Sequence, residues 1–312
     1  MARLVRQERV ALRYEILTMD SDYLASAMAA GDSVRIIAGR TTMVVAGAQT
    51  RHGCGPTVTA ALGRLLTGAA LMGSSLTGTE RIALRVAGDG PVGALTAEAM
   101  AGGRVRGYVY EPLADVPLNA SGKFDVGRLI GNGSLHVTRI YEGAQPYTSA
   151  VRLVSGEIGE DLAHYFARSE QIPTIVAVGV LANPRGVVAA GGILVQLLPG
   201  ADDTTMHELE KRALALPPVS GMIRDGASPE ALIEAIAAGL APRATGRGAI
   251  SFDCRCDRAR VVKALLSIGR AELQSMIEDD DTTEARCDFC GEVYRFSRPE
   301  LREILISGTT IA

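Results

Sequence analysis

Four of the five cysteines in this 312-residue chain lie in two short-spaced pairs near its C-terminal end. The pairs are Cys254-x-Cys256 and Cys287-x-x-Cys290, separated by thirty residues (257–286), and the fifth cysteine is Cys54. Tetrahedral zinc favours four thiolate ligands, and short-spaced pairs bring such ligands together at a small cost in loop-closure entropy. The spacing therefore predicts that the reduced protein binds one Zn²⁺ per chain through Cys254, Cys256, Cys287 and Cys290.

The sequence after the second pair has the form of a zinc knuckle. Gly291 follows Cys290, where a tight turn favours a residue that tolerates positive φ, and Val293, Tyr294 and Phe296 indicate a strand. Two other interpretations of the cysteines are four unpaired thiols in a core and a permanent disulfide pair. The disulfide interpretation is disfavoured, because nothing marks the chain as secreted.

Four arginines accompany the cysteine pairs: Arg255, Arg258 and Arg260 beside the first, and Arg286 beside the second. Nearby guanidinium groups stabilise thiolates and lower their pKa, and thiolates react with peroxide whereas thiols do not. The sulfurs are therefore either purely structural ligands or a redox sensor. The arginines are equally well explained as solvated charge on a short helix, and these residues alone leave both interpretations open.

The pattern C-x-C, about thirty residues, then C-D-x-C-G-x-x-Y-x-F resembles the C-terminal redox switch of the Hsp33 family. The segments GDGP (88–91) and GEIGEDLAHYFARSEQIPT (156–174) also look like the N-terminal domain of that family. The resemblance thus covers most of the chain, and its C-terminal motif is specific.

The resemblance implies a redox-regulated, ATP-independent holdase chaperone that is zinc-bound and inactive when reduced. It implies that peroxide with mild unfolding forms the disulfides Cys254–Cys256 and Cys287–Cys290 and releases zinc. In the family, linker helices then loosen, the protein forms a homodimer, and apolar surface binds unfolding client proteins. Such a protein is not an enzyme, so we expect no catalytic residues.

Composition limits the other functional classes. The chain is 47% hydrophobic with a net charge of −3, which is typical of a globular protein and disfavours nucleic acid as a partner. No apolar run follows the basic start MARLVRQERVALRYEIL, so we expect no signal peptide. The longest apolar region, 172–198, is interrupted by Asn-Pro-Arg-Gly at 183–186, which indicates a hairpin rather than a membrane span. We expect a cytoplasmic protein with no membrane partner.

The order of predicted elements indicates a mixed, mostly antiparallel α+β core domain over residues 1–199. Predicted helices cover 21–30, 57–71 and 162–169, and predicted strands cover 34–46, 81–87, 93–98, 104–110, 134–141, 175–181 and 187–198. Pro56 suits the first turn of the helix at 57–71, which is apolar on most faces and should be buried.

A helical linker is predicted over 200–247, with helices at 204–216 and 230–240 and a polar connection at 242–248. Helices this short are marginal alone, so they must pack against the sheet domain. The C-terminal zinc domain, 248–312, should contain helices at 258–268 and 270–277, followed by an acidic loop at 278–281. It is too small to be stable without its metal.

Two further groups are candidate sites. Cys54 near His52, just before a helix, is either a nucleophile or a small residue against the core. Asp161 and His164 are spaced to pair on a helix surface. No P-loop, dinucleotide fingerprint or nucleophile elbow occurs. The alternative function is a constitutive zinc-module adaptor for nucleic acid or protein, fused to an α+β domain. Suppression of client aggregation by the oxidised protein would discriminate the two.

Overall fold

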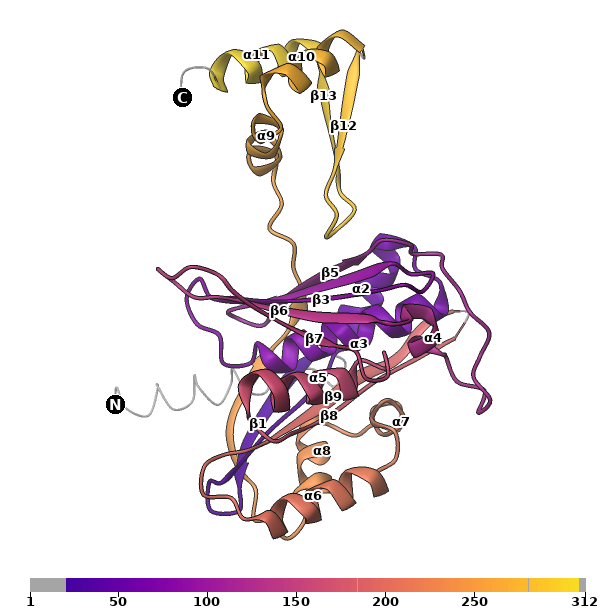
Figure 1. Cartoon of the computed structure of the whole chain (residues 1–312), viewed down its shortest axis with the longest axis vertical. Coiled ribbons are helices and arrows are strands. Elements are labelled where there is room, and N and C mark those ends of the chain that lie inside the picture. Colours follow the sequence, from indigo (N-terminus) through magenta and orange to yellow (C-terminus); the bar gives the residue numbers. More distant parts are fainter. Residues whose placement is uncertain (1–20, 184, 280, 309–312) are drawn as a thin grey trace, which may run out of the picture. The chain divides into compact units, whose positions relative to one another are not determined.

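The computed structural model describes residues 21–183, 185–279 and 281–308 (Figure 1). The predicted N-terminal sequence features at 1–17 lie outside these residues. Contacts divide the chain into two compact units, Met1–Phe252 (unit 1) and Asp253–Ala312 (unit 2), and each is described by itself. The predicted division into 1–199, 200–247 and 248–312 stays a functional proposal. By contacts, the linker belongs to unit 1.

The first sheet of unit 1 has five antiparallel strands in the order β10-β1-β2-β9-β8. Tyr23 in β1 lies opposite both Arg40 in β2 and Ala249 in β10, so the sheet joins distant parts of the chain. The strands are β1 Tyr23–Ala29, β2 Val34–Arg40, β8 Thr174–Asn183, β9 Gly186–Leu197 and β10 Arg243–Ala249.

The second sheet has six strands in the order β11-β5-β4-β3-β6-β7. All its pairs are antiparallel except β11, which runs parallel to β5. The strands are β3 Arg81–Gly88, β4 Ala94–Met100, β5 Arg104–Val109, β6 Gly133–Ile140, β7 Tyr147–Arg152 and β11 Ser251–Phe252. This meander confirms the predicted antiparallel α+β class.

Helix α3 (Pro56–Met72) lies between the two sheets and is buried on almost every face, as its sequence predicts (Figure 1). Small residues allow this close packing: a Cβ at Gly63 would lie 2.6 Å from Val45 and 2.8 Å from Val180. The other helices of the sheet region are α2 Thr42–His52, α4 Val126–Ile130 and α5 Gly159–Tyr165, followed by the π-helical turn η1 Phe166–Glu170.

The outer face of the five-stranded sheet is covered by α6 (Asp203–Ala215), α7 (Val219–Arg224) and α8 (Pro229–Ile236). Asp202 and Ser228 cap α6 and α8 by accepting backbone hydrogen bonds. Leu209 and Leu232 are fully buried against the sheet. The Tyr23 hydroxyl also donates to Glu230 at 2.7 Å. The predicted packing of linker helices on the sheet is therefore confirmed, although α7 was not predicted.

Three local predictions are wrong. The predicted helix at 21–30 is instead strand β1 (Tyr23–Ala29), because successive side chains, such as those of Leu24 and Ala25, face two opposite cores. Residues 42–46, predicted as strand, begin helix α2. The predicted polar connection at 242–248 is largely β10, which pairs with β1. Pairing with distant strands overrides local propensity in the first and third cases.

Unit 2 contains α9 (Arg258–Ser267), α10 (Arg270–Asp279), β12 (Thr282–Arg286), β13 (Val293–Ser297) and α11 (Arg298–Gly308). The two helices divided at Gly269 and the strand after the knuckle are confirmed. The acidic run was predicted as a loop, but its first two residues extend α10. Six buried hydrophobic residues form the core of the unit: Leu265, Leu273, Ile277, Phe296, Leu301 and Ile304.

Candidate metal centre

The four C-terminal cysteines come from two segments of unit 2. Cys254 and Cys256 lie in the irregular segment before α9, and Cys287 and Cys290 lie in the connection between β12 and β13. That connection is closed by two backbone hydrogen bonds, from Cys287 N–H to Glu292 O at 2.9 Å and from Gly291 N–H to Cys287 O at 2.8 Å. Gly291 has φ of 73°, which explains the glycine of the knuckle.

The four sulfurs lie within 4.8 Å of one another. The Sγ atoms of Cys254 and Cys287 are 3.7 Å apart, and those of Cys256 and Cys290 are 3.2 Å apart. Tetrahedral zinc with Zn–S bonds of about 2.3 Å requires sulfurs about 3.8 Å apart. The donor set and its spacing therefore fit a four-thiolate zinc site. No second group of three or more such ligands occurs in the described part of the chain.

The environment of the sulfurs is uneven. The Cys256 thiol is partly buried, which opposes ionisation, but hydrogen bonds from the Tyr294 hydroxyl at 3.2 Å and from the other thiols lower its pKa. Burial raises the pKa of Cys287 and, more strongly, that of Cys290. Four thiolates this close repel one another, so full ionisation of the cluster requires a cation.

The sequence places Tyr294 on the strand after the knuckle and within the motif C-D-x-C-G-x-x-Y-x-F, but it does not predict a contact with the sulfurs. Its hydroxyl donates to the Cys256 sulfur, and mainly this hydrogen bond raises the pKa of Tyr294. Its position in β13, four residues after Cys290, places its hydroxyl next to the first cysteine pair. The spacing C-x-x-C-x-x-x-Y was therefore the signal that could have identified it as a partner of the site.

Three of the four arginines near the cysteines form ion pairs with carboxylates. Arg255 pairs with Asp253, Arg260 with Asp257, and Arg258 with Glu300 at 2.6 Å. The Arg258 guanidinium also lies over the Phe296 ring, 4.2 Å from its centre. These contacts favour the structural explanation of these three arginines, since each has an acidic partner.

The two other sequence candidates have structural roles. Cys54 is buried, and burial raises the pKa of its thiol to about 12, so it does not provide a thiolate nucleophile. Asp161 does not form the predicted surface pair with His164. It is fully buried, and its carboxylate accepts hydrogen bonds from the backbone N–H groups of Val154, Ser155, Gly156 and Ile158.

No helix in the described part of the chain is long and apolar enough to cross a membrane. The apolar region at 172–198 instead forms the β8–β9 hairpin, as predicted.

Comparison with known proteins extends these observations to the whole chain. Residues 22–297 match the family model described as Hsp33 protein. The 33 kDa chaperonin of Desulforamulus reducens is 43% identical over 285 residues, covering 91% of this chain and 97% of that protein. The 33 kDa chaperonin of Bacillus subtilis is 42% identical over 282 residues, covering 90% and 97%.

A solved structure agrees with the sequence matches. The crystal structure of the 33 kDa chaperonin (heat shock protein 33 homologue) from Thermotoga maritima superposes with a TM-score of 0.87 at 36% identity. The match covers 93% of this chain and 99% of that one. Both units are therefore included in the likeness.

Proposed function

Because the chain belongs to the Hsp33 family of chaperones, we propose that it is a redox-regulated, ATP-independent holdase. It binds unfolding client proteins without turning over a substrate, so no residue is assigned a catalytic role. The observation that carries the proposal is the cluster of four sulfurs within 4.8 Å of one another. This arrangement both fits a metal and places thiols within reach of disulfide formation.

In the reduced protein, Cys254, Cys256, Cys287 and Cys290 hold one Zn²⁺. Zn²⁺ held there would stabilise four thiolates, and its ligands would come from the segment before α9 and from the β12–β13 hairpin. The Tyr294 hydroxyl supports this state by donating to Cys256. The resting form hides its client-binding surface and is inactive.

Oxidation converts the ligands into the disulfides Cys254–Cys256 and Cys287–Cys290. In each pair two thiolates lose two electrons to one hydrogen peroxide, which takes up two protons and leaves as two water molecules. The sulfur–sulfur distances of 3.7 and 3.2 Å join residues of different pairs, Cys254 with Cys287 and Cys256 with Cys290. Once the cluster opens, however, the shortest loops favour pairing within each motif.

Loss of the four ligands unfolds unit 2, and the linker helices α6, α7 and α8 then loosen from the sheet. Leu209, Leu232 and the sheet face that they cover become available to clients. The active form is a cytoplasmic homodimer that binds partially folded proteins, with no nucleic-acid or membrane partner.

The decisive measurement is light scattering by a heat-unfolding client protein mixed with the reduced, zinc-loaded chain or with the peroxide-oxidised chain. We expect suppression of aggregation by the oxidised form alone, and peptide mapping of that sample should find Cys254–Cys256 and Cys287–Cys290. Equal activity of both forms would favour the constitutive adaptor instead. Mainly Cys254–Cys287 crosslinks would disprove the proposed pairing.

A further inference from the structure

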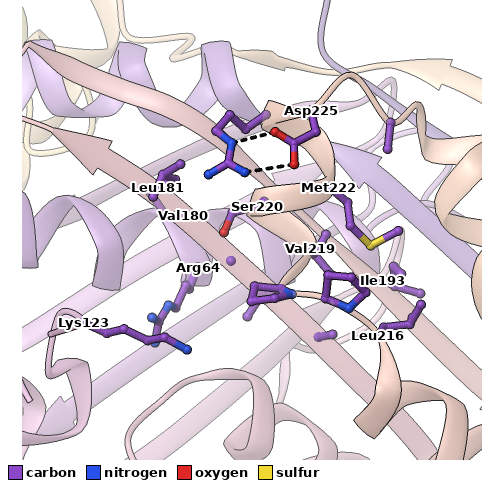
Figure 2. A pocket seen from close by; sticks show the side chains of 18 of the residues that line it. Arg64, Lys123, Val180, Leu181, Ile193, Leu216, Val219, Ser220, Met222 and Asp225 are labelled. Carbon is purple, nitrogen blue, oxygen red and sulfur yellow. Dashed lines mark hydrogen bonds and ion pairs between the residues drawn. The ribbon is translucent and has the colours of Figure 1, made fainter. Parts of the chain in front are cut away.

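A cavity of about 1120 Å³ runs along strand β8 in unit 1 (Figure 2). One wall is β8 and its neighbour β9. A second wall comes from the end of α6, the two prolines that follow it, α7 and one residue of α8. A third is the loop before α4, which contributes Lys123 and Phe124. The cavity therefore touches both the sheet and the linker helices.

Most of the lining is apolar. Figure 2 shows Leu181 and Ile193 from the sheet, and Leu216, Val219 and Met222 from the linker, around the same space. Large, mainly apolar cavities with a few polar groups are the usual form of a binding site for small organic molecules. This lining suits a ligand with a long apolar body.

The charged residues of the lining are not balanced. Arg224 and Asp225 pair with each other at 2.7 Å and neutralise one charge of each sign. Arg64 pairs with Glu157, yet its buried Nε–H has no hydrogen-bond partner. The exposed Lys123 forms no ion pair with any described residue. Positive charge is thus left unpaired beside an apolar space.

The hydroxyl of Ser220 adds a polar group to the middle of the lining. In Figure 2, Lys123 and Arg64 lie on one side of Ser220, and Asp225 lies on the other. The two polar ends of the cavity therefore differ in charge. One end has Lys123 without an ionic partner among the described residues, and the other has the Arg224–Asp225 ion pair. An anionic head is complementary to the Lys123 side only.

We propose that this cavity binds a free long-chain carboxylate, such as a fatty acid, as a single-chain amphipathic anion. Its alkyl chain lies against the apolar residues of β8, β9 and α7, and its carboxylate lies toward Lys123 and Arg64. A neutral apolar molecule would leave Lys123 unpaired, and a small hydrophilic anion would leave the apolar walls in water. An amphipathic anion is complementary to both the apolar walls and Lys123.

Binding has a consequence for regulation, and this part rests on the proposed holdase function. A ligand that contacts the sheet and the linker helices together binds the packed form in preference to the loosened one. It therefore stabilises the packed form by mass action. A long-chain carboxylate should raise the hydrogen-exchange protection of residues 203–236 and slow activation by oxidation.

The test is isothermal titration of the reduced, zinc-loaded, full-length protein with dodecanoate below its micelle-forming concentration. We expect one saturable site per chain. Shortening the alkyl chain should weaken binding about fourfold for each methylene removed, because burying one CH₂ is worth about 0.8 kcal/mol. Lys123→Glu should weaken binding about three- to tenfold, as expected for reversing one exposed charge.

Lys211→Glu is the matched control, since Lys211 is an exposed lysine of α6 outside the cavity. Equal affinities for the Lys123→Glu and Lys211→Glu variants, equal binding of dodecyltrimethylammonium, or no saturable binding would each overturn the proposal. The titration needs no oxidation, so it can succeed even if the holdase assay fails. Binding without added protection of 203–236 would overturn the regulatory part alone.

Discussion

Unit 1 and unit 2 bury very different amounts of apolar surface. Unit 1 encloses α3 between two sheets and adds a second core beneath the linker helices. Unit 2 buries six hydrophobic residues, of which only Phe296 is aromatic. A core of that size rarely supplies more than about 3–5 kcal/mol. Unit 1 thus spreads its stability over many contacts, whereas unit 2 concentrates it in one chemical site.

The sharpest test of this difference is removal of the metal ligands by the double substitution Cys287→Ser and Cys290→Ser. Structural zinc contributes about 10–16 kcal/mol of apparent binding energy in zinc-finger peptides, which exceeds the expected stability of this small core. We expect loss of bound zinc, measured by elemental analysis, and loss of exchange protection throughout 253–308. The part of unit 1 before Pro199 should remain protected.

Cys54→Ser serves as the control for that experiment, because Cys54 is buried in the core of unit 1. It should leave the zinc content at one per chain. Zinc retained by the double variant, or lost by Cys54→Ser, would contradict the assignment of ligands.

A second experiment asks whether the linker helices follow unit 2 or unit 1. Hydrogen exchange of the oxidised protein should show lost protection from about residue 204 to residue 307, with a loss of several kcal/mol at the backbone of Leu209 and Leu232. The strands before Pro199 should stay protected, because the four C-terminal cysteines lie in unit 2. Linker helices that exchange as slowly as in the zinc form would show that activation works in another way.

A third experiment weakens unit 1 at a single buried group. Asp161→Ala removes the acceptor of four backbone N–H groups, including that of Ile158, which is held at a positive φ of 69°. Each unsatisfied buried donor costs about 1–3 kcal/mol, and water that reaches the site offsets part of this cost. We therefore expect the free energy of unfolding of unit 1, measured in urea, to fall by ~2–4 kcal/mol. Zinc content should not change.

The neighbouring Glu160→Ala is the control, because Glu160 is exposed. An equal loss of stability in both variants would mean that the charge of the first helical turn matters and the hydrogen bonds of Asp161 do not.

The smallest expected effect concerns pH. Burial raises the pKa of Asp22 from 3.8 to about 6, despite hydrogen bonds from backbone N–H groups such as that of Val44. The folded state therefore holds this proton more tightly than the unfolded state does. The stability of unit 1 should be full below about pH 4 and fall by ~1–3 kcal/mol as the pH rises through 6.

Asp22→Asn should abolish most of that decline in unfolding free energy, measured from pH 4 to pH 7.5. Glu111→Gln, at an exposed position, should leave it unchanged. An unaltered pH dependence in Asp22→Asn would assign the decline to another group.

The features that could be predicted from the sequence have local causes. Pro56 and a run of small apolar residues specify α3, and two short cysteine spacings with Gly291 specify the metal cluster. The missed features depend on partners far away in the chain. Strand β10 is polar and glycine-rich, and it is a strand only because β1 pairs with it. The hydrogen bond from Tyr294 to Cys256 likewise depends on how two separate segments fold together.

The pairing of β1 with β10 also determines when the first sheet can be completed during biosynthesis. Ser26 of β1 precedes its partner Gly246 by 220 residues. At about 5–20 residues per second, the ribosome delivers that partner roughly 10–45 s after β1 has been made. Until then one edge of β1 has unpaired backbone groups beside apolar side chains, which is the kind of surface on which nascent chains associate. In every round of synthesis, the nascent chain is therefore prone to aggregate until β10 has been made.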